Sequence, residues 1–161
     1  MSITFANNVQ ELTYRKVAEY LSSSNLFKDS MRLWSEAPQF DILYGSAMVA
    51  VEVLPWDVNP WDTPGLAIVR ACSCVTFGSS IKTELMHYLL SENRRMRFGA
   101  FQLDENNQIL FADSVLGGEN MDLMELQTCI LSVVTIADTY DDIIVEKFGG
   151  QRAVDRLSVD I

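Results

Sequence analysis

The stretch between Phe98 and Gly150 most constrains the fold, because it predicts two strands followed by one long helix. The segments Phe98–Asp104 and Gln108–Leu116 show the two-residue alternation that is typical of half-buried strands. The Glu-Asn-Asn sequence between them favours a turn, since asparagine tolerates positive φ and hydrogen-bonds to its own backbone. We therefore predict a β-hairpin here.

A long helix is predicted from Met121 to Phe148, with Asn120 as its N-cap and Gly149-Gly150 as its left-handed end. At 1.5 Å per residue this helix would be ~42 Å long, enough to cross a domain of this size and to offer a second apolar flank to another subunit. Apolar residues recur along it at spacings of three and four, as in an amphipathic helix. The stripe consists of Leu123, Leu126, Ile130, Val133, Ala137, Tyr140 and Ile144.

The rest of the chain completes an α+β order. Amphipathic helices are predicted at Asn8–Ser22 and Ile81–Glu92, and strands at Phe40–Tyr44, Ala47–Leu54 and Gly65–Phe77. The strand at Ala47–Leu54 has apolar residues on both faces, which predicts cover on both sides. The fold class is thus α+β, a twisted and mainly antiparallel sheet with helices packed on it, in the order α-β-β-(β)-α-β-β-α.

Some segments are less informative. Residues 26–38 have no readable backbone pattern, although Trp34 and Phe40 are expected to be buried. Ser79 and Ser80 are predicted to cap the helix that follows them. After Gly150, residues 151–161 form a short tail that could add a helical turn.

Length and composition predict a single cytoplasmic domain. A chain of 161 residues suits one domain, with a core at about 8–150. There is no signal-like N-terminus and no apolar run of the ~18 residues that a membrane span needs. The three cysteines are an odd number, which fits a reducing cytosol.

The net charge of −10 argues against two classes of partner. Nucleic acid binding needs a basic face that can contact phosphates, and an anionic membrane attracts the same kind of face. An acidic surface instead favours protein partners that carry basic groups.

The hairpin and helix also resemble a known family. The residues Phe98-Gly-Ala-Phe-Gln-Leu-Asp104, Gln108-Ile-Leu-Phe111, Leu116-Gly-Gly118 and Phe148-Gly-Gly150 together resemble the YbjN family, most of all its small cyanobacterial and plastid members. That family shares the fold of type III secretion chaperones, which are small acidic dimers that hold partner polypeptides in extended form. The resemblance implies this fold and style of action, and it transfers no active site.

Two clusters could in principle bind metal. Asp138, Asp141, Asp142 and Glu146 lie on one predicted helical ridge, and paired carboxylates can hold Mg²⁺, although the solvated face of an amphipathic helix is the favoured interpretation. Cys72, Cys74, Cys129 and His87 add up to four possible zinc ligands, but a Cys-x-Cys pair lacks the usual spacing and packing is favoured. No catalytic residue, metal or cofactor is predicted, because a single histidine leaves little room for a catalytic triad.

Two segments are candidates for partner binding. The connector between Pro55 and Pro64 contains Trp56, Pro60 and Trp61; its prolines argue against a place inside a sheet and reduce the entropy lost on binding. Tryptophan is enriched at binding hot spots, but both indoles could equally close the end of the sheet.

The other candidate is the basic cluster of Arg94, Arg95 and Arg97, which follows a helix C-terminus where cations are favoured for structural reasons. It could also hold an acidic partner or the acidic ridge of a second subunit.

The leading hypothesis is a homodimeric, non-enzymatic chaperone-like or adaptor module that binds a protein or peptide segment. The alternatives are a small metal-dependent enzyme that uses the acidic ridge, and a sensor of a small apolar ligand with its pocket between the sheet and the long helix.

Overall fold

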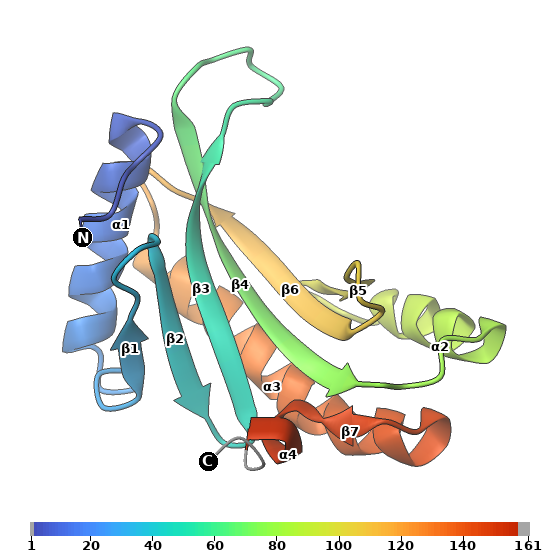
Figure 1. Ribbon diagram of the computed structural model, residues 1–161. Coiled ribbons are helices and arrows are strands. Elements are labelled where there is room, and N and C mark those ends of the chain that lie inside the picture. Colours follow the sequence, from blue (N-terminus) through green and yellow to red (C-terminus); the bar gives the residue numbers. More distant parts are fainter. Residues whose placement is uncertain (1, 158–161) are drawn as a thin grey trace.

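The computed structural model describes residues 2–157, and side chains through residue 155. It is an α+β fold in which a twisted antiparallel sheet packs against helices, as predicted (Figure 1). The elements in chain order are α1 (Asn8–Ser23), β1 (Met31–Leu33), β2 (Gln39–Tyr44), β3 (Ala47–Trp56), β4 (Leu66–Phe77), α2 (Thr83–Asn93), β5 (Ala100–Leu103), β6 (Ile109–Leu116), α3 (Leu123–Phe148), β7 (Gln151–Arg152) and α4 (Ala153–Leu157).

The sheet is built around β4. The strand order is β1-β2-β3-β4-β6-β5, and the two-residue β7 pairs with the end of β4. Helices α1 and α3 cover one face of the sheet (Figure 1). Fully buried residues of β3 such as Val49, Val51 and Val53 pack on this face against α3, whose Ile130 and Val133 are also fully buried.

The second face of the sheet differs from the prediction. Ala47–Leu54 was expected to be covered on both sides, but every second residue of β3 is only partly buried or exposed. Met48 retains 39% of its accessible surface, and the short helix α4 is the one helix among residues 2–157 that lies on this side (Figure 1). Among the described residues, the apolar side chains on this face therefore have α4 alone as a helical cover.

The hairpin forms as predicted. Asn107 has a φ of +59°, and the Asp104 carboxylate accepts hydrogen bonds from the backbone N–H groups of Asn106 (2.9 Å) and Gln108 (2.8 Å). The backbone of the turn is thus satisfied by its own side chains.

Helix α3 begins slightly later than predicted. Its N-cap is Asp122, whose Oδ1 accepts from Met124 N at 2.7 Å, rather than Asn120. Most of the predicted stripe is buried, but Leu123 is 45% exposed because it stands at the first turn, beyond the sheet's cover. Asp141, by contrast, is almost completely buried.

The unreadable segment 26–38 contains the edge strand β1. Phe40 is fully buried as expected, whereas the expectation for Trp34 is wrong, since this side chain is 46% exposed. Trp34 follows β1 and its indole Nε1 donates to Asp41 Oδ2 at 2.8 Å, which holds the ring against the open face. A tryptophan can lie on a surface when its N–H has such a partner.

Pro55 also departs from the prediction, because it pairs with Ala67 inside the β3–β4 ladder. The pairing of β2 with β3 ends at Glu52. Beyond that point β3 has β4 on one side only, so a residue without an N–H is tolerated there.

The chain crosses from the helical face to the open face directly after α3. Ser79 Oγ donates to Gly149 O at 2.9 Å and shares a 2.8 Å hydrogen bond with Thr76, so it does not cap α2 as predicted. Gly150 has a φ of +92°, and a Cβ there would stand 2.7 Å from Ser79 N. This crossing requires glycine for both conformation and space.

We expect Gly150→Ala to lower the free energy of unfolding by more than Gly78→Ala does. Both residues have positive φ, which costs an L residue about 1–2 kcal/mol. Only at Gly150 does the added methyl group also collide with the β4–α2 turn, because Gly78 has no atom within 4 Å of its Cβ position. Urea denaturation of the two variants measures the difference, and equal losses would contradict the tight crossing.

Candidate functional site

The open face of the sheet forms a continuous track along β3 and β4. On β3 it carries Met48, Ala50, Glu52, Leu54 and Trp56, because alternate side chains of a strand point to the same side. On β4 their ladder partners are Leu66 opposite Trp56, Ile68 opposite Leu54, Arg70 opposite Glu52, and Cys72 opposite Ala50. The loop that follows Trp56 and the middle of the sheet therefore lie on one surface.

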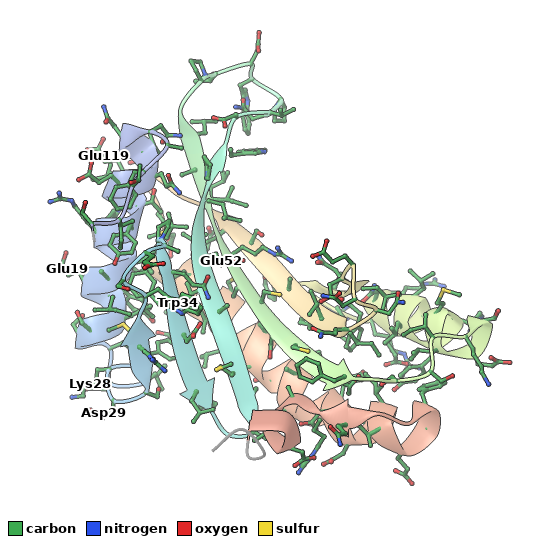
Figure 2. The ribbon with its side chains drawn as sticks, in the orientation of Figure 1. Glu19, Lys28, Asp29, Trp34, Glu52 and Glu119 are labelled. Carbon is green, nitrogen blue, oxygen red and sulfur yellow. The ribbon has the colours of Figure 1, made fainter. Side chains whose placement is uncertain are left out.

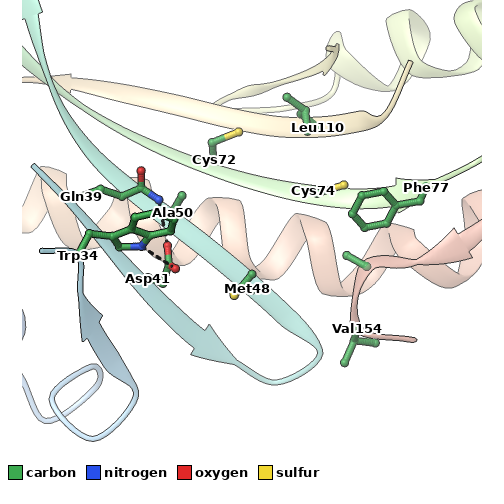
Figure 3. Close-up of a pocket in the computed structure, with 11 residues that line it drawn as sticks. Trp34, Gln39, Asp41, Met48, Ala50, Cys72, Cys74, Phe77, Leu110 and Val154 are labelled. Atoms are coloured by element: carbon green, nitrogen blue, oxygen red, sulfur yellow. Dashed lines mark hydrogen bonds between the residues drawn. The ribbon is translucent and has the colours of Figure 1, made fainter. Parts of the chain in front are cut away.

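One end of this track is hollowed into a groove of about 390 Å³. Its floor is low because small residues face each other across the ladder, with Ala50 opposite Cys72 and Cys72 opposite Ala112. Larger apolar side chains stand around them, as Figure 3 shows. The lining consists of Trp34, Gln39, Asp41, Met48, Ala50, Cys72, Cys74, Phe77, Leu110, Ala153 and Val154.

The middle of the track is polar. Arg70 lies 3.9 Å from Glu52 Oε2 and donates to Gln102 Oε1 at 3.1 Å. Figure 2 shows Glu52 midway along β3, on the same side of the sheet as Trp34. This opposite-charge pair separates the groove from a second apolar section at Leu54, Ile68 and Leu116.

The other end of the track is the loop between β3 and β4, residues 57–65, which projects beyond the sheet (Figure 1). We call it the Trp loop. Trp56 is partly buried and its ring packs edge-on against Trp61, with 5.8 Å between centroids, while Trp61 remains 63% exposed. Asn59 stabilises the loop, since its amide donates to Thr63 O at 2.7 Å and its Oδ1 accepts from Trp61 N at 3.1 Å. One indole is thus presented to solvent by a hydrogen-bonded loop.

The structure does not bring all the predicted partner-binding residues together. Trp56 ends β3, and Pro60 and Trp61 lie in the loop that follows it at one end of the open face. The arginines lie instead in the connection between α2 and β5: Arg94, Arg95 and Arg97. Figure 1 shows this connection away from the loop. Arg95 lies 3.8 Å from Glu92 Oε1 on the last turn of α2. The candidate residues therefore form two separate surfaces.

The thiols lie on opposite faces of the sheet. Cys72 and Cys74 line the groove, while Cys129 is buried on the sheet-facing side of α3. Burial raises the pKa of Cys129 to about 12 and also raises the pKa of Cys72, so both side chains are protonated thiols at neutral pH. Across residues 2–157, no three His, Cys, Asp or Glu side chains lie close enough to hold a metal ion.

The acidic ridge of α3 is partly structural. Ser46 at the β2–β3 turn donates to Asp138 through its backbone N–H at 3.1 Å and to Asp141 Oδ2 through its hydroxyl at 3.2 Å. Asp138 and Asp142 are exposed, as a solvated helical face predicts, but for Asp141 that interpretation is wrong. Asp141 is buried because the β2–β3 turn packs on it.

The open groove was missed from sequence. Trp34, which stands over the groove, was expected to be buried, and Cys72 was considered only as packing or a metal ligand. The signal in the sequence is the apolar character of both faces of β3, which predicts two covering layers. An apolar strand face without a cover in the same chain is instead a candidate binding surface.

We expect Asp141→Asn to gain stability relative to the wild type as pH rises. Burial raises the pKa of Asp141 against the opposing hydrogen bonds from Asp142 N–H and Ser46. The folded chain thus holds the proton of Asp141 more tightly than the unfolded chain does, in which the pKa of an aspartate is about 3.9. The resulting contribution to stability is complete below that value and is lost as pH rises through the folded pKa.

Urea unfolding at pH 4 to 7 tests this expectation. The difference in unfolding free energy, variant minus wild type, should increase across the range because asparagine does not ionise. Glu146→Gln, which removes an exposed charge from the same helix, is the matched control. A difference for Asp141→Asn that is constant or falls with pH would refute the argument.

Comparisons with known proteins agree with the architecture. A family model described as T3SS (YopN, CesT) and YbjN peptide-binding chaperone 1 matches residues 17–156. A comparison with curated proteins gave no match. Over the residues that the structure describes, no helix combines the length and the apolarity needed to span a membrane.

Proposed function

The chain belongs to the T3SS (YopN, CesT) and YbjN peptide-binding chaperone 1 family, and from this premise we propose that it is a non-enzymatic module that binds an extended segment of a partner protein along the open face. The observation that carries this proposal is the continuous track from the groove to the Trp loop. Its two apolar sections flank a single opposite-charge pair.

The length of the track sets the length of the bound segment. Met48 and Trp56 are eight residues apart on β3, which corresponds to ~26 Å at about 3.3 Å per residue. A segment of about eight extended residues would cover this distance. Its alternate side chains would point down onto the face, so we expect apolar residues at these positions and polar residues between them.

Docking on the face is favoured over strand addition at a sheet edge. At β5 the outer edge is occupied by Asn93, whose Oδ1 accepts from Phe101 N at 2.6 Å and whose Nδ2 donates to Phe101 O at 3.3 Å. At the other edge β1 is three residues long. Short or covered edges give a partner strand few hydrogen bonds.

We also propose that two copies associate through the exposed flank of α3, with Arg95 and Arg97 at this interface. Phe98 is 54% exposed and Met124 is 67% exposed, and Phe98 and Thr128 line two adjacent hollows along α3. The arginines line one hollow and Glu125 lines the other. In a two-fold arrangement, the arginines of one protomer would face Glu125 of the partner subunit.

We expect Ala50→Phe to weaken peptide binding about tenfold, or ~1.4 kcal/mol, because the new ring fills the floor of the groove. The probe is a synthetic peptide selected from a random display library on the immobilised wild type, and fluorescence anisotropy measures its binding. Trp61→Ala should also weaken binding, since an exposed indole is a typical hot spot.

The matched control is Ala6→Phe, an exposed position before α1. It should leave the affinity unchanged. Equal affinity in wild type and Ala50→Phe would place the peptide elsewhere. Failure to select any peptide, together with a small apolar molecule retained by purified protein in denaturing mass spectrometry, would favour the sensor of an apolar ligand, for which the groove volume is sufficient.

For the dimer, we expect sedimentation velocity to show a homodimer that Met124→Asp converts to monomers, because a charge would be buried in the apolar centre of the interface. Met86→Asp is the matched control, since Met86 is 42% exposed on α2, outside both hollows. A monomeric wild type, or a Met124→Asp variant that remains dimeric, would contradict this interface. The cytoplasmic location and the cyanobacterial or plastid origin stay predictions.

A further inference from the structure

The C-terminal segment occupies part of the open face. Helix α4 is the one helix on this side of the sheet among residues 2–157, and it lies against the ends of β3 and β4 (Figure 1). Ala153 and Val154 line the groove together with Cys74 and Phe77. Figure 3 shows Val154 at the end of the groove opposite Trp34, with Met48 between them. The chain therefore places its own side chains where a bound segment would end.

The chain just before α4 is firmly attached. Gln151 pairs with Phe77 and Arg152 pairs with Thr76 in the β4–β7 ladder. The preceding Gly150 lies so close to the β4–α2 turn that an added Cβ would collide with it, as described above. This part of the tail belongs to the sheet and is not free to move with α4.

Helix α4 itself makes a small contact with the groove. It has five residues, too few for a helix to be stable on its own. Among its described side chains, those of Ala153 and Val154 line the groove, and both are small and partly exposed. At its start, Arg152 of β7 donates two hydrogen bonds of 2.9 Å to the Asp155 carboxylate and lies 3.3 Å from Asp142 of α3. These pairs join α4 to β7, and β7 to α3, and they lie outside the groove lining.

We propose that α4 is a displaceable internal occupant of the groove, which covers its Cys74 end in the free protein and leaves when a partner segment fills the track. This inference rests on the proposed function, since it assigns a regulation to the same site. The fixed β7 would be the hinge, and α4 the moving part. An occupant that must leave before binding lowers the apparent affinity. The apparent association constant equals the intrinsic constant multiplied by the fraction of molecules that are already open.

The first test needs no partner. Val154→Gly removes the side chain that contacts the groove and weakens the helix without adding charge. The rate of alkylation by N-ethylmaleimide, resolved for each cysteine by peptide mass spectrometry, should rise several-fold at Cys74 and less at Cys72. Val58→Gly, which makes the same change in the distant Trp loop, should leave both rates unchanged. An unchanged rate at Cys74 in a folded Val154→Gly variant would overturn the proposal.

The second test uses the display-selected peptide as the probe. Its affinity should be several-fold tighter for Val154→Gly than for wild type, because the variant no longer has to release a stable α4. Faster alkylation without tighter binding would overturn the role of α4 as an occupant. Failure of the proposed function would look different: no selected peptide would bind either form, although Cys74 would still react faster in the variant.

Discussion

The structure depends on the pairing of β4 with β3 and β6 on its two sides. These ladders fix the register in which Ala71 faces the helices while Cys72 faces away from them. Because side chains alternate along a strand, one register decides the composition of both faces at once. A shift by one residue would move valines to the open side and the polar Arg70 into the core.

The helical face and the open face have different physical roles. On the helical face, α3 supplies an almost continuous row of buried aliphatic residues, and the energy of folding comes mainly from covering this side. On the open face, small residues at the centre of the ladder leave a groove instead of a smooth surface. The stability of the first face allows the second to keep apolar residues that do not contribute to the core.

The end of α3 connects the two faces. Gly150 and Ser79 bring the chain round the end of β4. Ser46 in the β2–β3 turn hydrogen-bonds to Asp138 and Asp141 of α3. The groove thus has a floor built from the paired strands β3 and β4, and a small contact with α4 at its Cys74 end. We infer that regulation and binding involve different parts of one groove.

The sequence by itself determined the elements with strong local signals: the hairpin with its Asn107 turn, the position of α3, the α+β order and the family. These depend on patterns a few residues long, such as the two-residue and 3.6-residue periods. Only the tertiary structure decided that Trp34 lies on the surface, that Asp141 is buried, and that α4 is the one helix on the open face among residues 2–157. Each of these depends on contacts between residues far apart in the chain, such as Ser46 with Asp141 or Phe77 with Gln151, and a local pattern carries no information about which distant segment will cover a given face.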